Sequence, residues 1–238
     1  MLQRLLFFAL IAQLGAMLLG WALLAPAISL LTSKRRGATI GRAAVSLIYR
    51  GFWASAERLG MMRVDASALD RLRDEPGGLI IAANHPTMLD AMVVVARLPR
   101  GVCVMKAELM RNPFLGSGAR LARYIRNDIG RGMVRGAVES LQGGGQLVLF
   151  PEGTRTVKKP VDAFRPGITL IAHLAQVPIQ TVIIESDSPY LAKGWPLLRP
   201  PPARINVRVR LGKRFAPEAD HRANLRRIEA YFARELGA

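Results

Sequence analysis

Short apolar runs alternate with longer mixed segments from residue 79 onward, and glycine or proline bounds many of the runs. Such short, largely β-branched runs are typical of buried strands. The predicted strands are residues 79–83, 101–105, 123–126, 146–150 and 178–184. The predicted helices are residues 130–141 and 167–175, with a loop and helix over 106–114. This alternation predicts an α/β fold: a mixed, largely parallel sheet flanked by helices.

In the last forty residues, the spacing of apolar and polar residues follows two different periods. From Arg204 to Leu211 apolar and polar residues alternate, which predicts a half-exposed strand near an edge of the sheet. Residues 217–236 have a helical period and predict a terminal amphipathic helix. The side chains expected to face inward are Leu225, Ile228, Tyr231, Phe232 and Leu236.

Residues 5–31 contain no charged side chain, and about 20 apolar residues are enough to cross a bilayer. A cleaved signal peptide is disfavoured because the apolar stretch is too long. Gly15, Gly20 and Pro26 leave open a kinked hairpin that only dips into one leaflet. The basic residues Lys34, Arg35 and Arg36 follow, which places the remainder of the chain on the cytoplasmic face of the inner membrane.

Residues 40–64 combine an apolar helical face with scattered arginines. This pattern suits either a basic helix at the membrane interface or an ordinary core-packing helix, and Phe52 with Trp53 favours the headgroup layer. We therefore expect a membrane anchor with an interfacial helix over residues 1–64 and a catalytic domain over 65–238. Residues 65–76 are polar and predict a short helix and a turn.

The net charge of +17 requires an anionic partner, either nucleic acid or an anionic membrane surface. The basic residues are scattered, aromatic residues make up only 6%, and an apolar segment opens the chain, so we expect the membrane surface and no nucleic acid. Cys103 is the single cysteine and is expected to be a small buried hydrophobic residue. Spacings typical of a zinc site do not occur, and no metal is predicted.

Polar clusters follow two of the predicted strands. Asn84-His85 comes after the first, with Asp90 five positions beyond the histidine; Glu152-Gly153-Thr154-Arg155 follows the strand at 146–150. Ligands of open α/β sheets bind at this carboxyl edge. His85 is suited to act as a general base with Asp90 fixing its tautomer, and Arg155 offers a fork for phosphate. The alternatives are a turn-capping histidine, a Glu152–Arg155 surface pair, and a metal hydrolase that uses His85, Asp90 and Glu152.

Together the two clusters resemble the glycerolipid acyltransferase family, typified by lysophosphatidate acyltransferases. The family blocks are Asn-His-x-x-x-x-Asp and Phe-Pro-Glu-Gly-Thr-Arg, which stand here at 84–90 and 150–155. The resemblance covers roughly residues 79–185. It implies an acyl-CoA or acyl carrier protein donor, a lysophospholipid acceptor, no acyl-enzyme and no cofactor. His85 would take the hydroxyl proton while Asp90 orients it. The residues that would bind the acceptor are Glu152, Gly153, Thr154, Arg155, Lys106, Arg126 and Arg165.

One block departs from the family pattern. Many lysophosphatidate acyltransferases carry Phe-Ile-Asp-Arg between the two main motifs, whereas this chain has Tyr124-Ile125-Arg126-Asn127. The arginine stands one position early, and one position in a strand moves a side chain to the opposite face. Lysophosphatidate is the first expectation for the acceptor. Lyso-ornithine lipid or another hydroxylated lipid is the alternative, and a non-catalytic membrane scaffold is a third possibility.

Overall fold

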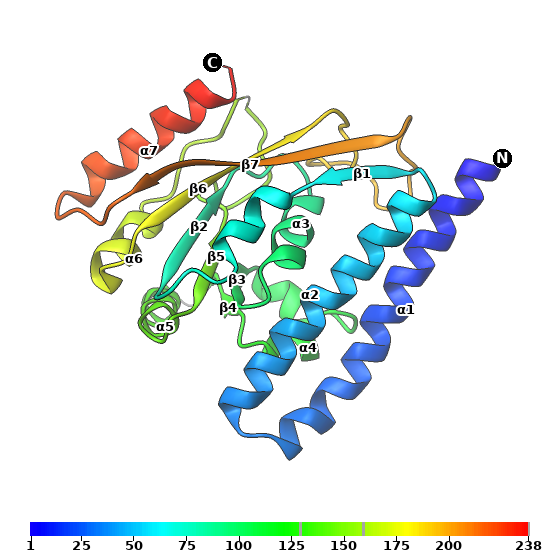
Figure 1. The fold of residues 1–238 in the computed structure, drawn as a ribbon, viewed down its shortest axis with the longest axis horizontal. Coiled ribbons are helices and arrows are strands. Elements are labelled where there is room, and N and C mark those ends of the chain that lie inside the picture. The colour runs from blue at the N-terminus through cyan, green and yellow to red at the C-terminus, as the bar shows by residue number, and fades with distance from the viewer. Residues whose placement is uncertain (129, 159, 238) are drawn as a thin grey trace.

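The computed structural model describes residues 1–128, 130–158 and 160–237, which fold around one twisted sheet (Figure 1). Seven strands lie in the order β1-β7-β6-β2-β5-β3-β4 within these ranges. Five of them, from β6 to β4, are parallel; β7 is antiparallel to β6, and β1 is parallel to β7. Their bounds are β1 Met62–Asp65, β2 Leu79–Ala83, β3 Gly101–Met105, β4 Ile125–Arg126, β5 Gln146–Leu149, β6 Ile179–Ser186 and β7 Ile205–Phe215. The predicted mixed, largely parallel sheet is confirmed.

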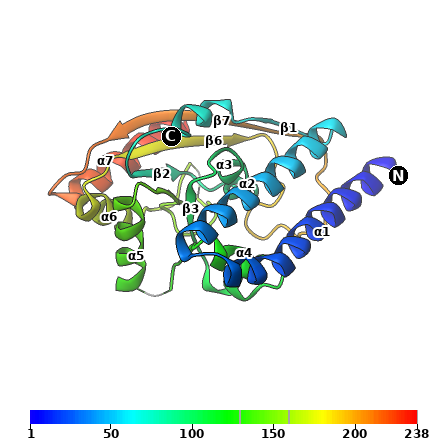
Figure 2. The ribbon, with the colours of Figure 1, turned by 60° about the horizontal axis from the view of Figure 1, so that its bottom comes forward.

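Helices cover both faces of the sheet (Figures 1 and 2). Strand β2 shows why: Ile81 and Ala83 join a core with α2 and α3, while Ile80 and Ala82 join a second core with α5, α6 and α7. A strand that is buried on both faces reads as a continuous apolar run. The α-helices are α1 Leu2–Leu31, α2 Lys34–Arg58, α3 Leu89–Arg97, α4 Gly116–Leu121, α5 Arg131–Gln142, α6 Gly167–Ala175 and α7 His221–Glu235. Two 3₁₀ turns, Ser67–Leu72 and Ala107–Arg111, lie within the described residues.

The first two helices form an antiparallel pair that lies beside the sheet (Figures 1 and 2). Gln13 on α1 donates a side-chain hydrogen bond to Ser55 on α2, over 2.8 Å. The second helix packs closely on the α4 turn, since a Cβ at Gly41 would approach the Ala122 backbone nitrogen to 2.6 Å. The kinked hairpin that was left open within residues 5–31 does not form: α1 is one continuous helix that includes Pro26. The hairpin is formed by α1 and α2 instead.

The segment 40–64 differs from its prediction in two respects. The helix ends at Arg58, and Met62–Asp65 is an edge strand that pairs with β7. Residue 64, the expected domain boundary, therefore lies inside β1. Phe52 and Trp53 are buried in the core shared with α3, so placing them in the headgroup layer was wrong. Amphipathic periodicity shows that a face is buried, and it does not show whether protein or lipid buries it.

Most of the remaining elements match their predictions closely. Strands β2 and β3 and helix α6 have the predicted bounds. The strand expected at 123–126 is reduced to Ile125–Arg126. Strand β7 continues four residues beyond Leu211 and lies next to the edge strand β1, as the alternation indicated. Cys103 is buried, and burial raises the pKa of its thiol to about 12.

Candidate active site

The polar clusters meet where β2 and β5 end side by side. These two strands pair in register from Leu79 with Gln146 to Ala82 with Leu149, so the segments that follow leave the sheet together. Two hydrogen bonds join them: the His85 amide donates to Glu152 Oε1 over 2.9 Å, and the Thr156 amide donates to the His85 carbonyl over 2.8 Å. The sheet thus brings together two motifs that are more than sixty residues apart in the chain.

Asn84 sets the point at which the chain turns away from β2. Its buried side chain accepts a hydrogen bond from the Ile184 amide over 2.7 Å and donates one to the Ile184 carbonyl over 2.8 Å. The carboxamide thereby extends the pairing of β2 with β6 by one residue beyond the strand. The sequence analysis gave Asn84 no role of its own; its place immediately before His85 was the available signal.

His85 and Asp90 form a hydrogen-bonded pair. His85 Nδ1 lies 2.9 Å from Asp90 Oδ2, and the ring stacks on Phe150 with centroids 4.0 Å apart. Since an ionised carboxylate only accepts hydrogen bonds, Nδ1 donates and Nε2 is left as the acceptor, with no hydrogen bond to it among the described residues. The His85 side chain is 18% exposed and Asp90 only 1%. The arrangement presents one basic nitrogen to a partly open site.

Asp90 is held from several directions on the first turn of α3. Its Oδ2 accepts a hydrogen bond from the Thr87 amide over 2.7 Å, and Oδ1 accepts one from the Thr87 hydroxyl over 2.8 Å. Burial raises the pKa of Asp90 above its ordinary value, although the hydrogen bonds from His85 and Thr87 act in the opposite direction. The carboxylate is fixed before any substrate arrives, which favours one orientation of the imidazole.

Glu152 is a structural centre of the second motif. It is buried, and its oxygens accept three hydrogen bonds: from the His85 amide, from the Thr156 hydroxyl at 3.0 Å and from the Asp162 amide at 2.9 Å. A buried carboxylate with three donors is well compensated. In this position Glu152 ties the His85 segment to the loop that follows β5.

Gly153 needs the absence of a side chain for two reasons. Its φ of +70° is a left-handed conformation, and a Cβ there would collide with the Arg165 side chain. Arg165 therefore lies directly over the Gly153 backbone, while its own amide donates to the Pro151 carbonyl over 2.8 Å. Arg165 as a residue is exposed.

Arg155 braces a neighbouring loop. Its Nη1 donates to the carbonyls of Leu191 and Ala192, over 2.9 and 3.0 Å. Leu191 has a φ of +60°, unusual for a branched side chain, and its carbonyl also accepts the Met88 amide over 3.1 Å. Arg155 thus joins the loop between β6 and β7 to the segment after β5, and the Met88 amide joins the same loop to the segment that carries His85. The sequence analysis did not anticipate this contact.

The remaining predicted residues lie farther along the same edge. Lys106 follows β3 and is exposed, and Arg126 ends β4 and is exposed. Because strands are spaced about 4.8 Å apart, these positions are two and three strand widths from β2. The Arg126 guanidinium makes two hydrogen bonds to Asp128, of 3.0 and 2.7 Å. Thr154 follows β5 and is half-buried, and no hydrogen bond of its side chain occurs within the described residues.

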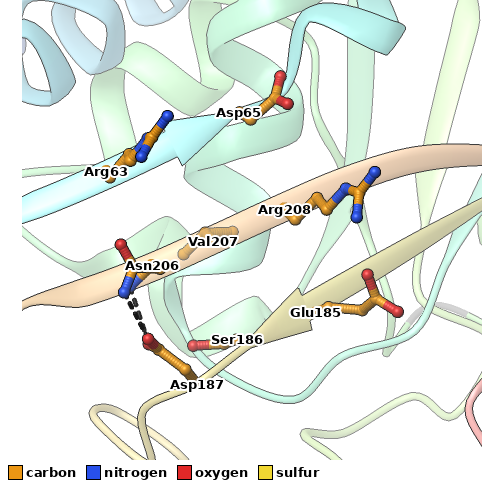
Figure 3. Close-up of a pocket in the computed structure, with 8 residues that line it drawn as sticks. All are labelled: Arg63, Asp65, Glu185, Ser186, Asp187, Asn206, Val207 and Arg208. Atoms are coloured by element: carbon orange, nitrogen blue, oxygen red, sulfur yellow. Dashed lines mark hydrogen bonds between the residues drawn. The ribbon is translucent and has the colours of Figure 1, made fainter.

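A separate cavity of about 600 Å³ lies on the exposed sheet face formed by β1, β7 and the end of β6 (Figure 3). Arg208 stands between Asp65 and Glu185 there, and the cavity contains none of the motif residues. Within residues 1–128, 130–158 and 160–237, no group of three histidine, cysteine, aspartate or glutamate side chains is placed to hold a metal ion. The metal-hydrolase alternative gains no support from the described residues.

Comparison with known proteins gives three findings. A family model described as Acyltransferase matches residues 63–185. The chain is similar to a 1-acyl-sn-glycerol-3-phosphate acyltransferase of Limnanthes alba, with 30% identity over 53% of this chain and 47% of the relative. It is also similar to an enzyme of that name from Helicobacter pylori, with 32% identity over 46% of this chain and 49% of the relative. The chain thus spans about half the length of the curated relatives it matches.

Among solved structures, the crystal structure of the 1-acyl-sn-glycerophosphate (LPA) acyltransferase PlsC from Thermotoga maritima superimposes with a TM-score of 0.70. The match covers 99% of this chain and 93% of that chain, at 20% sequence identity. At this identity the likeness shows a shared fold, with the N-terminal helices included in the matched region.

Proposed function

Because this chain belongs to the acyltransferase family by the match over residues 63–185, we propose that it moves a fatty acyl group from a thioester to a lysolipid hydroxyl. The donor is acyl-CoA or acyl carrier protein, and the product is an ester. The observation that carries the proposal is the His85–Asp90 pair, with Nδ1 bonded to the carboxylate and Nε2 free. This is the arrangement that a general base needs.

The reaction needs no covalent intermediate on the protein, because the donor is already activated. The acceptor hydroxyl oxygen attacks the thioester carbonyl carbon while its proton passes to His85 Nε2. Asp90 stabilises the imidazolium that forms. The tetrahedral intermediate collapses with cleavage of the C–S bond, and the departing sulfur takes the proton back from His85. The protein ends the cycle unchanged.

The acceptor headgroup would bind along the edge formed by β5, β3 and β4. The Arg165 side chain lies over the Gly153 backbone, in the space that a side chain at position 153 would fill. Within the described residues only Nη1 of Arg155 makes hydrogen bonds, to the Leu191 and Ala192 carbonyls, so Nε and Nη2 are available there for a ligand. We assign phosphate binding to Arg155 and Arg165 together with Lys106, and assign the ordering of this loop to Glu152.

Lysophosphatidate is the first candidate for the acceptor, with phosphatidic acid as the product. The names of the Limnanthes alba and Helicobacter pylori relatives support it. A specific observation favours the alternative of another hydroxylated lysolipid: the Arg126 guanidinium is already paired with Asp128 through two hydrogen bonds. An arginine paired in this way has less capacity to bind a phosphate.

We propose that the enzyme lies on a membrane through α1, the one described helix long and apolar enough to cross a bilayer. Leu23, Leu30 and Leu31 are among its exposed apolar side chains. Both halves of α1 contact the catalytic body: Phe7 packs on Tyr190, and the Ser117 hydroxyl donates to the Ala22 carbonyl. A helix held along its length against one body favours lying within a single leaflet over crossing both. The basic residues at 34–36 favour the cytoplasmic face of the inner membrane.

The test is acyl transfer by the membrane-bound protein with labelled acyl-CoA or acyl carrier protein and a panel of lysolipids. His85→Ala should lower kcat by about 10² to 10⁴-fold, the usual contribution of a general base. His173→Ala removes a half-buried histidine on α6 and serves as the matched control, with activity expected to stay near that of the wild type. An active His85→Ala enzyme would refute the mechanism. A wild type that acylates no lysolipid from either donor would favour the non-catalytic scaffold.

A further inference from the structure

A charged cavity of about 500 Å³ lies at the first turns of α1 and shares no residue with the His85 site. Its walls come from the start of α1, the turn between α2 and β1, and the loop between β6 and β7. Figure 1 shows the N-terminus near the end of α2 and the start of β1. The lining residues are Gln3, Arg4, Phe8, Gly60, Met61 and residues 199–204.

The cavity contains three arginines and no carboxylate. Arg4, Arg199 and Arg204 line it, and none of the three makes an ion pair within the described ranges. The cavity on the exposed sheet face is different, because two arginines there stand among three carboxylates (Figure 3). Uncompensated guanidinium groups that converge on one cavity are suited to a phosphate.

The arginine-bearing loop is stiff. Three consecutive prolines, residues 200–202, restrict its backbone. Arg199 lies over the Trp195 ring at 5.0 Å from the centroid, and Trp195 Nε1 donates to the Arg199 carbonyl over 3.0 Å. The cationic wall is thus formed by contacts within the protein, which lowers the entropy cost of binding an anion.

Exposed apolar side chains surround the cationic cavity. Phe8 lines it and is itself exposed, Leu2 and Leu5 lie on the same turns of α1, and Leu197 and Leu198 are exposed just before Arg199. A free phosphate ion would gain nothing from these side chains, whereas the acyl chains of a lipid would cover them.

We propose that this cavity binds the phosphate headgroup of an anionic membrane phospholipid, whose acyl chains lie along the first turns of α1. The inference rests on the proposed membrane association of α1. It adds a discrete lipid site, formed by Arg4, Arg199 and Arg204, to the general attraction of a basic protein for an anionic surface.

A short-chain phosphatidylglycerol, kept below its micelle concentration, tests the cavity without a membrane surface. Isothermal titration calorimetry should show saturable binding at one site, and Trp195 fluorescence should change with it because Arg199 lies over that ring. Replacing Arg4, Arg199 and Arg204 together with Gln should weaken binding by at least about tenfold, since charge-assisted hydrogen bonds are lost. Ala203→Glu, which leaves every arginine in place, should do the same by repulsion.

The matched control replaces Lys34, Arg35 and Arg36 with Gln, removing the same charge from exposed positions at the α1–α2 turn. Its affinity for the short-chain lipid should stay within about twofold of the wild type, because binding at a defined cavity does not depend on distant screened charges. Equal losses in both triple variants would overturn the site. Equal affinity for short-chain phosphatidylcholine would overturn the choice of an anionic ligand, and equal affinity for inorganic phosphate would overturn the lipid.

A vesicle sedimentation experiment distinguishes failure of this inference from failure of the proposed membrane association. Wild-type protein should sediment with phosphatidylcholine vesicles that contain phosphatidylglycerol. If it sediments with no vesicle, the membrane association fails and the lipid inference fails with it. If it sediments but the short-chain titration shows no saturable site, only the cavity inference is overturned.

Discussion

The His85 site and the α1–α2 hairpin differ in whether their side chains find partners within the protein. At the site, the buried side chains of Asp90 and Glu152 have partners within the protein, and each carboxylate accepts three hydrogen bonds. On α1, apolar side chains such as Leu23 remain exposed, and the arginines near its start make no ion pair within the described residues. The polar groups of the site are hydrogen-bonded within the protein, whereas the exposed apolar face of the hairpin is suited to contact with lipid.

The difference also separates two kinds of sensitivity to mutation. A buried hydrogen-bonded group that loses its partner carries a desolvation cost within the protein. An exposed apolar side chain contributes little to the fold and much to partition into lipid. Changes at the site should therefore lower turnover, and should also lower stability where buried donors lose their acceptor. Changes on the outer face of α1 should have an effect only when a membrane is present.

The largest effect is expected at Glu152. Glu152→Ala should abolish activity and lower the free energy of unfolding by about 3 kcal/mol, because three donors, those of His85, Thr156 and Asp162, lose their acceptor. Denaturant unfolding measures the stability. Glu139→Ala, in an exposed pair with Arg135, is the control and should cost less than about 0.5 kcal/mol. Equal stabilities of the two variants would contradict the comparison.

Asp90→Asn should separate turnover from folding. The amide can no longer stabilise an imidazolium, and kcat should fall by about 10² to 10⁴-fold with little change in KM. Steady-state kinetics with varied acceptor measures both constants. If the substitution changes only KM and leaves kcat unchanged, Asp90 does not have the proposed role.

The pH dependence of stability tests whether the pKa of Asp90 is raised in the folded protein. Its raised pKa means that the folded protein binds a proton at pH values where the unfolded chain has released it. We therefore compare the free energy of unfolding of the wild type with that of Asp90→Asn. The difference, wild type minus variant, should fall as the pH rises from the ordinary aspartate pKa, about 3.9, to the pKa of Asp90 in the folded protein. Denaturant titrations of both proteins across this range measure the difference. A difference that grows with pH would show a lowered pKa instead.

Two leucines of α1 test the hairpin side of the comparison. Leu10 is 2% exposed and Leu23 is 73% exposed. Leu10→Ala should lower the free energy of unfolding by about 2 to 5 kcal/mol. Leu23→Ala should change it by less than about 0.5 kcal/mol while weakening vesicle binding roughly tenfold. If Leu23→Ala leaves vesicle binding unchanged, the outer face of α1 does not meet lipid.

The sequence predicted best those elements whose pattern had one physical explanation. Residues 79–83 and 101–105 are buried on both faces, and their uninterrupted apolar runs give the strand bounds directly. His85, Asp90 and Glu152 could be placed at one sheet edge because each follows such a strand. The sequence left open whether residues 5–31 form one helix or a kinked hairpin, because a proline such as Pro26 can either interrupt a helix or be accommodated within it.

Other features depend on contacts between distant residues. The side chain of Asn84 bonds to Ile184, one hundred positions away, and Arg155 bonds to a loop with no periodic pattern. Strand β1 has only four residues, too few to show a period, and becomes a strand because β7 offers it an edge. The burial of Trp53 follows from packing between α2 and the sheet. Each of these requires the assembled fold.

The smallest effect is expected where the site meets the surface, at the exposed pair of Arg126 and Asp128. Asp128→Asn should free Arg126 and raise kcat/KM for lysophosphatidate by less than about fivefold, because exposed ion pairs contribute about 1 kcal/mol or less. The gain should shrink at high salt and be absent with a lysolipid that lacks a phosphate. Acylation rates with the two acceptors at two ionic strengths measure it. If neither Asp128→Asn nor Arg126→Ala alters either rate, Arg126 lies outside the acceptor site, and the preorganised network ends at Arg165.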